Sequence, residues 1–271
     1  MNSPETVYES QLAAAEKKAA LPFCRMAALG ALAGACIALG ACTSSMAAFG
    51  LAGRDYGLAR LVAGAVFPVG LILIVLTGAE LFTGNCLMEM AWASRRVSAR
   101  RMLRNLGCVW CANFAGSFAV AALAWGSGQW AAGGHALGLY TVKVAAGKAA
   151  LAPGAAFCSG VLCNVLVCFA ILAAGASKGA AGKIFAVWFP IMAFVLGGFE
   201  HSVANMYYLP AGMLALLDPA TAGKAAGIGL GPESVCLAGV AKNLLFVTLG
   251  NVAGGMLCIG ALWGFSHKPA A

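Results

Sequence analysis

Long apolar stretches separated by short polar segments make up most of the chain. Six such belts can be read, at residues 26–53, 59–94, 105–134, 149–177, 184–215 and 235–265. Each is longer than the ~20 residues that a helix needs to cross the hydrocarbon core of a bilayer. Backbone groups in lipid must be paired within their own segment, so an open chain crosses as helices. The pattern predicts an all-α polytopic membrane protein with six transmembrane helices.

The two ends of the chain are more polar than the belts. Residues 1–25 carry charges of both signs and predict an amphipathic helix lying on the membrane surface. They are too polar for the apolar region of a signal peptide. We therefore expect one transmembrane domain over residues 26–265, preceded by this helix and followed by a short tail at 266–271.

Composition strengthens the membrane assignment. Of the 271 residues, 62% are hydrophobic and only 10% are charged, too few charges to cover a water-soluble surface. The net charge of +8 lies at belt ends, with no basic stripe between exposed aromatics, so we expect no nucleic-acid partner. Cys108 and Cys111 form a CxxC pair without a second pair or a histidine at zinc spacing. The sequence thus predicts no metal site and no cofactor.

The basic residues also predict the orientation. With six spans, both termini and the loops after belts two and four share one side of the membrane. That side carries eleven of the seventeen basic residues, and the other side, pore included, carries six. Because short cytoplasmic loops are enriched in Lys and Arg, we expect both termini to be cytoplasmic.

Two pairs of segments repeat along the chain. The pattern Gly78, Glu80, Asn85 recurs 120 positions later as Gly198, Glu200, Asn205. The segment 104–116 recurs 138 positions later as 242–254, with seven matching positions in thirteen. The halves 26–134 and 149–265 each hold three spans, an odd number, so they cross the membrane in opposite directions. This predicts an inverted repeat, the plan of many transporters and channels.

Belts two and five contain both the repeated motif and the helix breakers Gly and Pro. A matched pair of broken helices indicates a binding site near the middle of the membrane. Glu80 and Glu200 are interpreted mainly as scaffold, because a carboxylate can accept hydrogen bonds from N–H groups that a break leaves unpaired. Gly78, Asn85, Gly198 and Asn205 are assigned to the same scaffold.

His201 has no counterpart in the first half, where Leu81 occupies the equivalent position. We interpret it as a titrating group of a pore, since imidazole changes charge near neutral pH. Lys148, at the start of belt four, is either an anchor at the membrane interface or a lure for anions at a vestibule mouth. The amides of Asn164 and Asn251 offer neutral hydrogen bonds inside the membrane.

Four segments resemble recurring motifs of the formate/nitrite transporter family: residues 75–84 (VLTGAELFTG), 160–170 (GVLCNVLVCFA), 198–206 (GFEHSVANM) and 247–251 (VTLGN). The resemblance implies an aquaporin-like fold and a homopentamer in the bacterial inner membrane, with one pore per subunit. By alignment with the motifs it implies an apolar constriction at Phe67, Leu71 and Phe194. It implies polar pore positions at Thr83, Lys148, Asn164, Glu200, His201 and Asn251.

The resemblance further implies passage of small monovalent anions, and we expect formate, with proton-linked passage at His201. The alternatives are a nitrite or hydrosulfide channel of the same fold, or a channel for neutral solutes or water with the apolar residues as a size filter. An enzyme is not expected, because no nucleophile, base and orienting group recur together.

Overall fold

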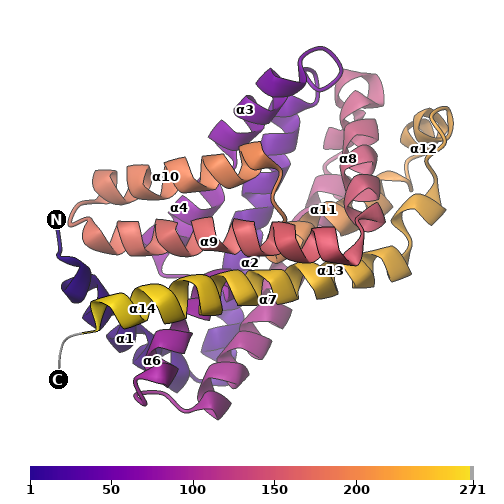
Figure 1. The fold of residues 1–271 in the computed structure, drawn as a ribbon. Helices are drawn as coiled ribbons and strands as arrows, with labels where there is room; N and C mark the ends of the chain where they lie inside the picture. The colour runs from indigo at the N-terminus through magenta and orange to yellow at the C-terminus, as the bar shows by residue number, and fades with distance from the viewer. Residues whose placement is uncertain (269–271) are drawn as a thin grey trace.

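In the computed structural model, residues 1–268 are described, and every regular element within them is helical (Figure 1). Six helical segments are long and apolar enough to cross a membrane: Phe23–Ala48, Tyr56–Thr77, Ala99–Gly126, Pro153–Ala176, Ala180–Gly197 and Pro232–His267. The prediction of an all-α protein with six spans is confirmed.

The helices follow one another in two runs. The first run is α1 Pro4–Ala20, α2 Phe23–Ala48, α3 Tyr56–Val66, α4 Val69–Thr77, α5 Phe82–Asn85, η1 Cys86–Met88, α6 Glu89–Ala93 and α7 Ala99–Gly126. The second is η2 Gln129–Ala131, α8 Ala132–Ala150, α9 Pro153–Ala176, α10 Ala180–Gly197, α11 Ser202–Ala215, α12 Pro219–Ala226, η3 Pro232–Val235, α13 Leu237–Val252, the π-helical η4 Ala253–Ala261 and α14 Leu262–His267. Of the expected tail, Ser266 and His267 belong to α14, and residues 269–271 lie outside the described part.

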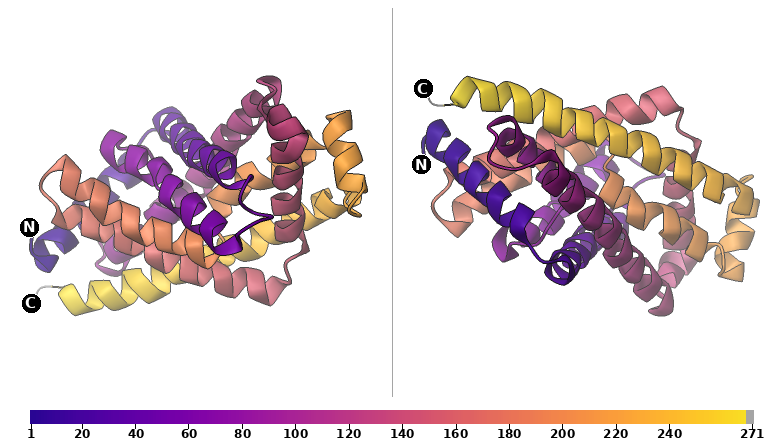
Figure 2. Two further views of the ribbon diagram at one scale, coloured as in Figure 1. Left: turned by 90° about the horizontal axis from the view of Figure 1, so that it is seen from above. Right: turned by 90° about the horizontal axis from the view of Figure 1, so that it is seen from below.

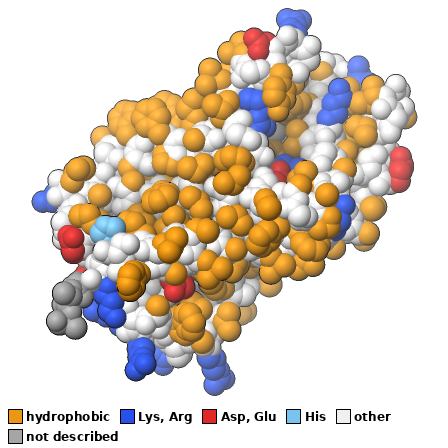
Figure 3. Space-filling view, viewed as in Figure 1, with side chains coloured by type: hydrophobic (Ala, Val, Ile, Leu, Met, Phe, Trp, Pro, Cys, Tyr) orange, Lys and Arg blue, Asp and Glu red, His pale blue; other side chains and the backbone are white. Residues whose placement is uncertain are grey.

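The spans form a bundle with charged ends and an apolar flank. The first residues of α1 and the last of α14 lie at the same end of the molecule (Figure 2). On the face shown in Figure 3, hydrophobic side chains cover most of the surface, and Lys and Arg gather toward its ends. Phe189, Leu257 and Leu262 on this bundle are each more than 60% exposed. Such an apolar belt suits contact with lipid or with another copy of the chain.

Helix α1 packs along one side of the bundle. Ser3 begins it as a cap, with its Oγ accepting from the N–H of Thr6. Its buried residues recur every three or four positions, the spacing of one helix face: Val7, Tyr8, Leu12, Ala15 and Ala19. This face contacts α6, α7 and α9.

Helix α8 covers residues 135–148, which lie between the two predicted halves, 26–134 and 149–265. Its C-terminal end repeats that of α1: residues 18–21 and 148–151 both read KAAL, 130 positions apart. Helix α1 ends at Ala20 and α8 ends at Ala150. The correspondence between the halves therefore extends to these two helices.

Glycines allow neighbouring spans to touch along their backbones. A Cβ at Gly116 of α7 would lie 1.9 Å from the carbonyl oxygen of Ala31 in α2. A Cβ at Gly254, the equivalent residue of the second half, would lie 2.3 Å from the carbonyl oxygen of Val161 in α9. Small residues give membrane helices this close approach, and here both halves use the same position.

The chain leaves the helical conformation at the repeated motif. Helix α4 is followed by Gly78 at φ +74° and α10 by Gly198 at φ +73°. Glycine adopts this left-handed conformation without the steric cost of a Cβ. Three residues then cross to the next helix, α5 in the first half and α11 in the second.

An asparagine from a neighbouring span closes each break. Its Oδ1 accepts from the first N–H of the new helix, and its Nδ2 donates to two carbonyl oxygens. Asn113 makes these bonds to Phe82, Gly30 and Glu80 at 2.9, 2.7 and 3.0 Å. Asn251 makes them to Ser202, Gly160 and Glu200 at 2.8, 2.8 and 3.0 Å. The backbone groups freed by each break are thus paired inside the protein.

A buried carboxylate in the first break is held by two side chains, and a third links them into a ring. Glu80 is 4% exposed, and its Oε1 lies 3.1 Å from Nζ of Lys18 in α1. Asn85 accepts from Lys18 at 2.6 Å and donates to Glu80 Oε2 at 2.7 Å. Its amide also donates to Asn105 Oδ1 at 2.7 Å, and Asn105 donates to the carbonyl of Lys18 at 3.3 Å. The result is a closed ring of hydrogen bonds.

The second break carries a similar arrangement with Lys148 of α8, except that Asn205 Oδ1 accepts no hydrogen bond from a described residue. Glu200 is 5% exposed, and its Oε1 accepts from Lys148 Nζ at 2.7 Å. Asn205 donates to Glu200 Oε2 at 2.6 Å and to Asn243 Oδ1 at 2.7 Å. Asn243 donates to the carbonyl of Lys148 at 2.8 Å. The sequence interpretation expects these carboxylates to accept from backbone N–H groups freed by the breaks, but among the described residues their partners are side chains, and one lysine compensates each charge.

Gly116→Ala tests the backbone contact between α2 and α7. We expect it to lower the free energy of unfolding by about 1–3 kcal/mol, because the added methyl group forces the helices apart. Gly107→Ala, in the same helix with no atom within 4 Å of the added Cβ, serves as the control. Thermal unfolding in detergent measures both, and equal melting temperatures would contradict the contact.

Lys18→Ala tests the compensation of Glu80. We expect the free energy of unfolding to fall by about 3 kcal/mol, the lower end of the range for a broken buried ion pair, because Lys18 is partly exposed. The double variant Lys18→Met with Glu80→Gln removes both charges and should recover most of the melting temperature. Lys17→Ala removes a neighbouring exposed charge that forms no ion pair with a described residue. If it melts like Lys18→Ala, the ion pair contributes nothing.

Candidate functional site

The predicted constriction residues meet at the centre of the bundle. Phe67, Leu71 and Phe194 are at most 3% exposed, and the rings of Phe67 and Phe194 pack edge to face with centroids 5.4 Å apart. They border a central cavity of about 10 Å³, lined by Ile37, Phe67, Leu71, Leu81, Val167, Ile191, Phe194 and His201. That volume is close to the minimum for one water molecule. The path is therefore closed to anything larger in this conformation.

His201 is the one polar residue in the lining of the central cavity. It precedes α11 and is 2% exposed. Its ring stacks on Phe194, with centroids 5.8 Å apart. Leu81, its equivalent in the first half, lines the same cavity. The two halves thus place an imidazole and an aliphatic side chain at matching positions.

The hydrogen bonds of His201 define which nitrogen carries the proton. Nδ1 lies 3.1 Å from the backbone nitrogen of Ala204, which can only donate, so Nδ1 accepts as a helix cap. The neutral ring then carries its hydrogen on Nε2, 2.9 Å from Oγ1 of Thr83. Nε2–H is the donor directed at the first half of the molecule. A cationic ring requires Nδ1 to give up the bond to Ala204.

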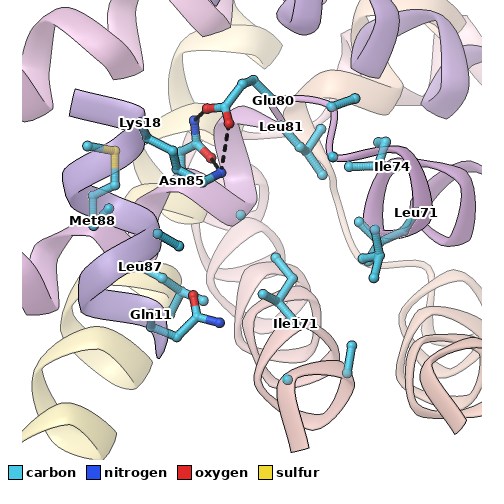
Figure 4. A pocket seen from close by; sticks show the side chains of 18 of the residues that line it. Gln11, Lys18, Leu71, Ile74, Glu80, Leu81, Asn85, Leu87, Met88 and Ile171 are labelled. Atoms are coloured by element: carbon cyan, nitrogen blue, oxygen red, sulfur yellow. Dashed lines mark hydrogen bonds and ion pairs between the residues drawn. The ribbon is translucent and has the colours of Figure 1, made fainter. Parts of the chain in front are cut away.

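Two larger cavities flank the constriction. We call the first the α1 vestibule; it has a volume of about 410 Å³ and is lined by residues of α1 together with Leu71, Glu80, Leu81 and Asn85 (Figure 4). The second, the α8 vestibule, has about 540 Å³ and is lined by residues of α8 together with Phe67, Phe194, Glu200 and His201. Leu71 and Leu81 border both the α1 vestibule and the central cavity, while Phe67, Phe194 and His201 border both the α8 vestibule and the central cavity. The three cavities thus lie in series.

Both vestibules carry more basic than acidic residues. In the α1 vestibule Lys18 is paired with Glu80, and Lys183 is a further basic residue. In the α8 vestibule Lys148 is paired with Glu200, and Arg60 and Lys143 are further basic residues. Lys148 Nζ also lies 5.2 Å from the ring centre of Tyr208. An anion entering either cavity meets a positive potential.

Two of the predicted polar residues are bonded to backbone and line none of these three cavities. Asn164 uses both amide hydrogens on the carbonyls of Thr83 and Asn251, at 3.2 and 2.6 Å. Asn251 uses both of its own to close the second break. Thr83 is fully buried and also lines none of the three cavities; its Oγ1 lies 2.9 Å from His201 Nε2. In this conformation the two asparagines position the site from behind its walls.

The remaining predicted residues lie at the breaks, with Gly78, Glu80 and Asn85 along the α1 vestibule and Gly198 along the α8 vestibule. In the sequence, Lys18 stands out only as one of the basic residues that predict the orientation, although the repeated KAAL pairs it with Lys148. Arg60 and Lys143 likewise belong only to the six basic residues of the opposite side. Nothing in their local sequence distinguishes them, because the hollow that they border forms only on folding.

The comparisons with known proteins agree on one family. The sequence model of the formate/nitrite transporter family matches residues 5–265. A probable formate transporter of Methanothermobacter thermautotrophicus is 37% identical, covering 98% of this chain and 97% of that protein. The formate channel FocA of Haemophilus influenzae is 38% identical, covering 88% of this chain and 85% of its own. These relatives are transporters and channels rather than enzymes.

Two solved structures share the fold. An ion channel of the FNT family superimposes with a TM-score of 0.83 at 30% identity, covering 97% of this chain and 99% of its own. A pentameric formate channel with formate bound gives a TM-score of 0.82 at 28% identity, covering 91% and 98%. Together with the two vestibules and the constriction between them, these matches show that the chain belongs to the formate/nitrite transporter family.

Proposed function

We propose that this protein is a membrane channel for small monovalent anions, with formate as its first substrate. The observation that carries the proposal is the series of cavities: two positively charged vestibules separated by an apolar constriction with one polar lining residue, His201, which is hydrogen-bonded to the buried Thr83. The formate channels and transporters among its relatives support the choice of formate. The predominance of positive charge along both vestibules favours anions over the neutral solutes of a water-type channel.

We propose the assembly and orientation along the same lines. The exposed apolar flank and the pentameric formate channel of the same fold support a homopentamer with one pore per subunit. The excess of basic residues on the side of α1 and α14 supports cytoplasmic termini in a bacterial inner membrane. In that orientation the α1 vestibule opens to the cytoplasm and the α8 vestibule to the opposite side.

The constriction explains why a polar group is needed at its centre. A bare anion entering the ring of Phe67, Leu71 and Phe194 loses its hydration shell, and neutral hydrogen bonds return only part of that cost. We propose that the anion displaces the Thr83 hydroxyl from His201 Nε2–H and takes that hydrogen bond itself. The nearby ion pair of Lys148 and Glu200 leaves little net charge beside the ring.

Proton-linked passage follows from the two nitrogens of His201. When Nδ1 takes up a proton and releases the Ala204 N–H, the ring becomes cationic beside the anion. Transfer of the Nε2 proton then converts formate into neutral formic acid, which crosses the apolar ring at lower cost. The imidazole is left neutral with its hydrogen on Nδ1, and loss of that proton with protonation of Nε2 restores the starting tautomer. Because protonation of the ring is favoured at low pH, flux rises as pH falls. Nitrite and hydrosulfide, also small and singly charged, fit the same scheme.

His201→Asn tests this mechanism with little disturbance of the fold, because asparagine is a good helix cap and still accepts from Ala204. We expect formate uptake into proteoliposomes to fall about tenfold or more below pH 6, and its rise at low pH to disappear, since a general acid contributes at least that much. The melting temperature should stay close to that of the unaltered protein.

Side-by-side uptake of formate, nitrite and hydrosulfide, with osmotic water flow as the fourth measurement, separates the alternatives. Water flow without anion uptake would contradict the proposed anion channel. Anion uptake with an unchanged pH response in His201→Asn would keep the channel and remove histidine from its mechanism.

A further inference from the structure

The α8 vestibule is lined by basic side chains that take no part in the ion pair of Lys148 and Glu200. Lys148 lies 2.7 Å from Glu200, so its ammonium compensates that buried carboxylate. Glu200 is the one acidic residue in the lining of this vestibule. Arg60 and Lys143 border the same cavity and form no ion pair with any residue among 1–268. The attraction of this vestibule for anions therefore comes from these two side chains.

Arg60 is held in place with donors to spare. It projects from α3 to the C-terminal end of α10, where Nε donates to the carbonyl of Leu196 at 3.3 Å and Nη2 donates to that of Val195. A guanidinium has five N–H groups, so three make no hydrogen bond to the described residues. The free part of this planar fork matches the two oxygens of a carboxylate.

Lys143 supplies a second charge with a different character. It lies on α8 just over one turn before Lys148, is exposed, and makes no hydrogen bond to a described side chain or backbone group. Its ammonium can therefore follow an anion within the vestibule. In the α1 vestibule one basic residue, Lys183, forms no ion pair with residues 1–268, where the α8 vestibule has two such residues.

We propose that Arg60 and Lys143 form an anion-accumulating site in the α8 vestibule, which binds a small carboxylate such as formate before it reaches the constriction. This inference rests on the proposed anion channel and assigns its first binding step to these residues. Charges in a confined hollow raise the local concentration of the opposite ion, and the effect weakens as salt screens it. The site lies before the central barrier, so it governs the concentration at which uptake saturates and leaves the maximal rate unchanged.

The test is formate uptake into proteoliposomes by the double variant Arg60→Gln with Lys143→Gln. Because two uncompensated charges are lost, we expect its half-saturation concentration at low ionic strength to rise about three- to tenfold. The maximal rate should stay unchanged. In the unaltered protein half-saturation should rise with added salt, and in the double variant it should hardly change. Arg54→Gln with Lys224→Gln removes two exposed charges that border neither vestibule and is the matched control.

Single variants separate the effect of the positive charges from the effect of the hydrogen bonds that Arg60 makes to α10. Lys143→Gln breaks no hydrogen bond and should raise half-saturation about twofold even if Arg60→Gln folds poorly. Arg60→Lys keeps the charge but loses the fork, so it should recover the salt dependence and only part of the affinity. Half-saturation equal to the control in both single variants would overturn the site. So would a loss of maximal rate alone. No uptake by the unaltered protein would remove the proposed channel and this site with it.

Discussion

A helix that breaks inside a membrane must still pair every freed backbone group, and this requirement organises the centre of the protein. Water is absent at that depth, so the partners come from the protein itself. Asn113 and Asn251 supply three bonds each to the two breaks. Beside them Glu80 and Glu200 are buried as partners of Lys18 and Lys148. The breaks are thereby fixed points from which the pore is built.

The two halves match in their scaffold residues and differ at the central cavity. The asparagines that close the breaks, the lysine–glutamate pairs and the glycines at helix contacts recur in both halves. Leu81 and His201, in contrast, differ at equivalent positions on the central cavity. The scaffold needs the same hydrogen bonds on both sides, so its residues stay matched. A second polar group at the position of Leu81 would add a desolvation cost without a partner.

Much of this arrangement could be predicted from the sequence, and the reasons for the rest are physical. Apolar length gave the six spans, and the matched Gly, Glu and Asn gave the repeat. Helix α8 was missed because Gly133, Gly134 and His135 begin it in a left-handed conformation and its lysines interrupt the apolar pattern. Asn251 was assigned to the pore because an amide's partners come from remote segments, and spacing cannot show that both hydrogens are taken.

The position of Lys18 gives the beginning of the chain an unexpected status. Helix α1 precedes the first span, and its polar sequence suggests an appendage that could be shortened freely. Yet its lysine ends inside the pore, on the carboxylate of Glu80. A protease or an alternative start site that removes this helix would leave an uncompensated carboxylate at one vestibule, which would repel the anions that the proposed channel conducts. The terminal segment is thus an integral wall of the conduit.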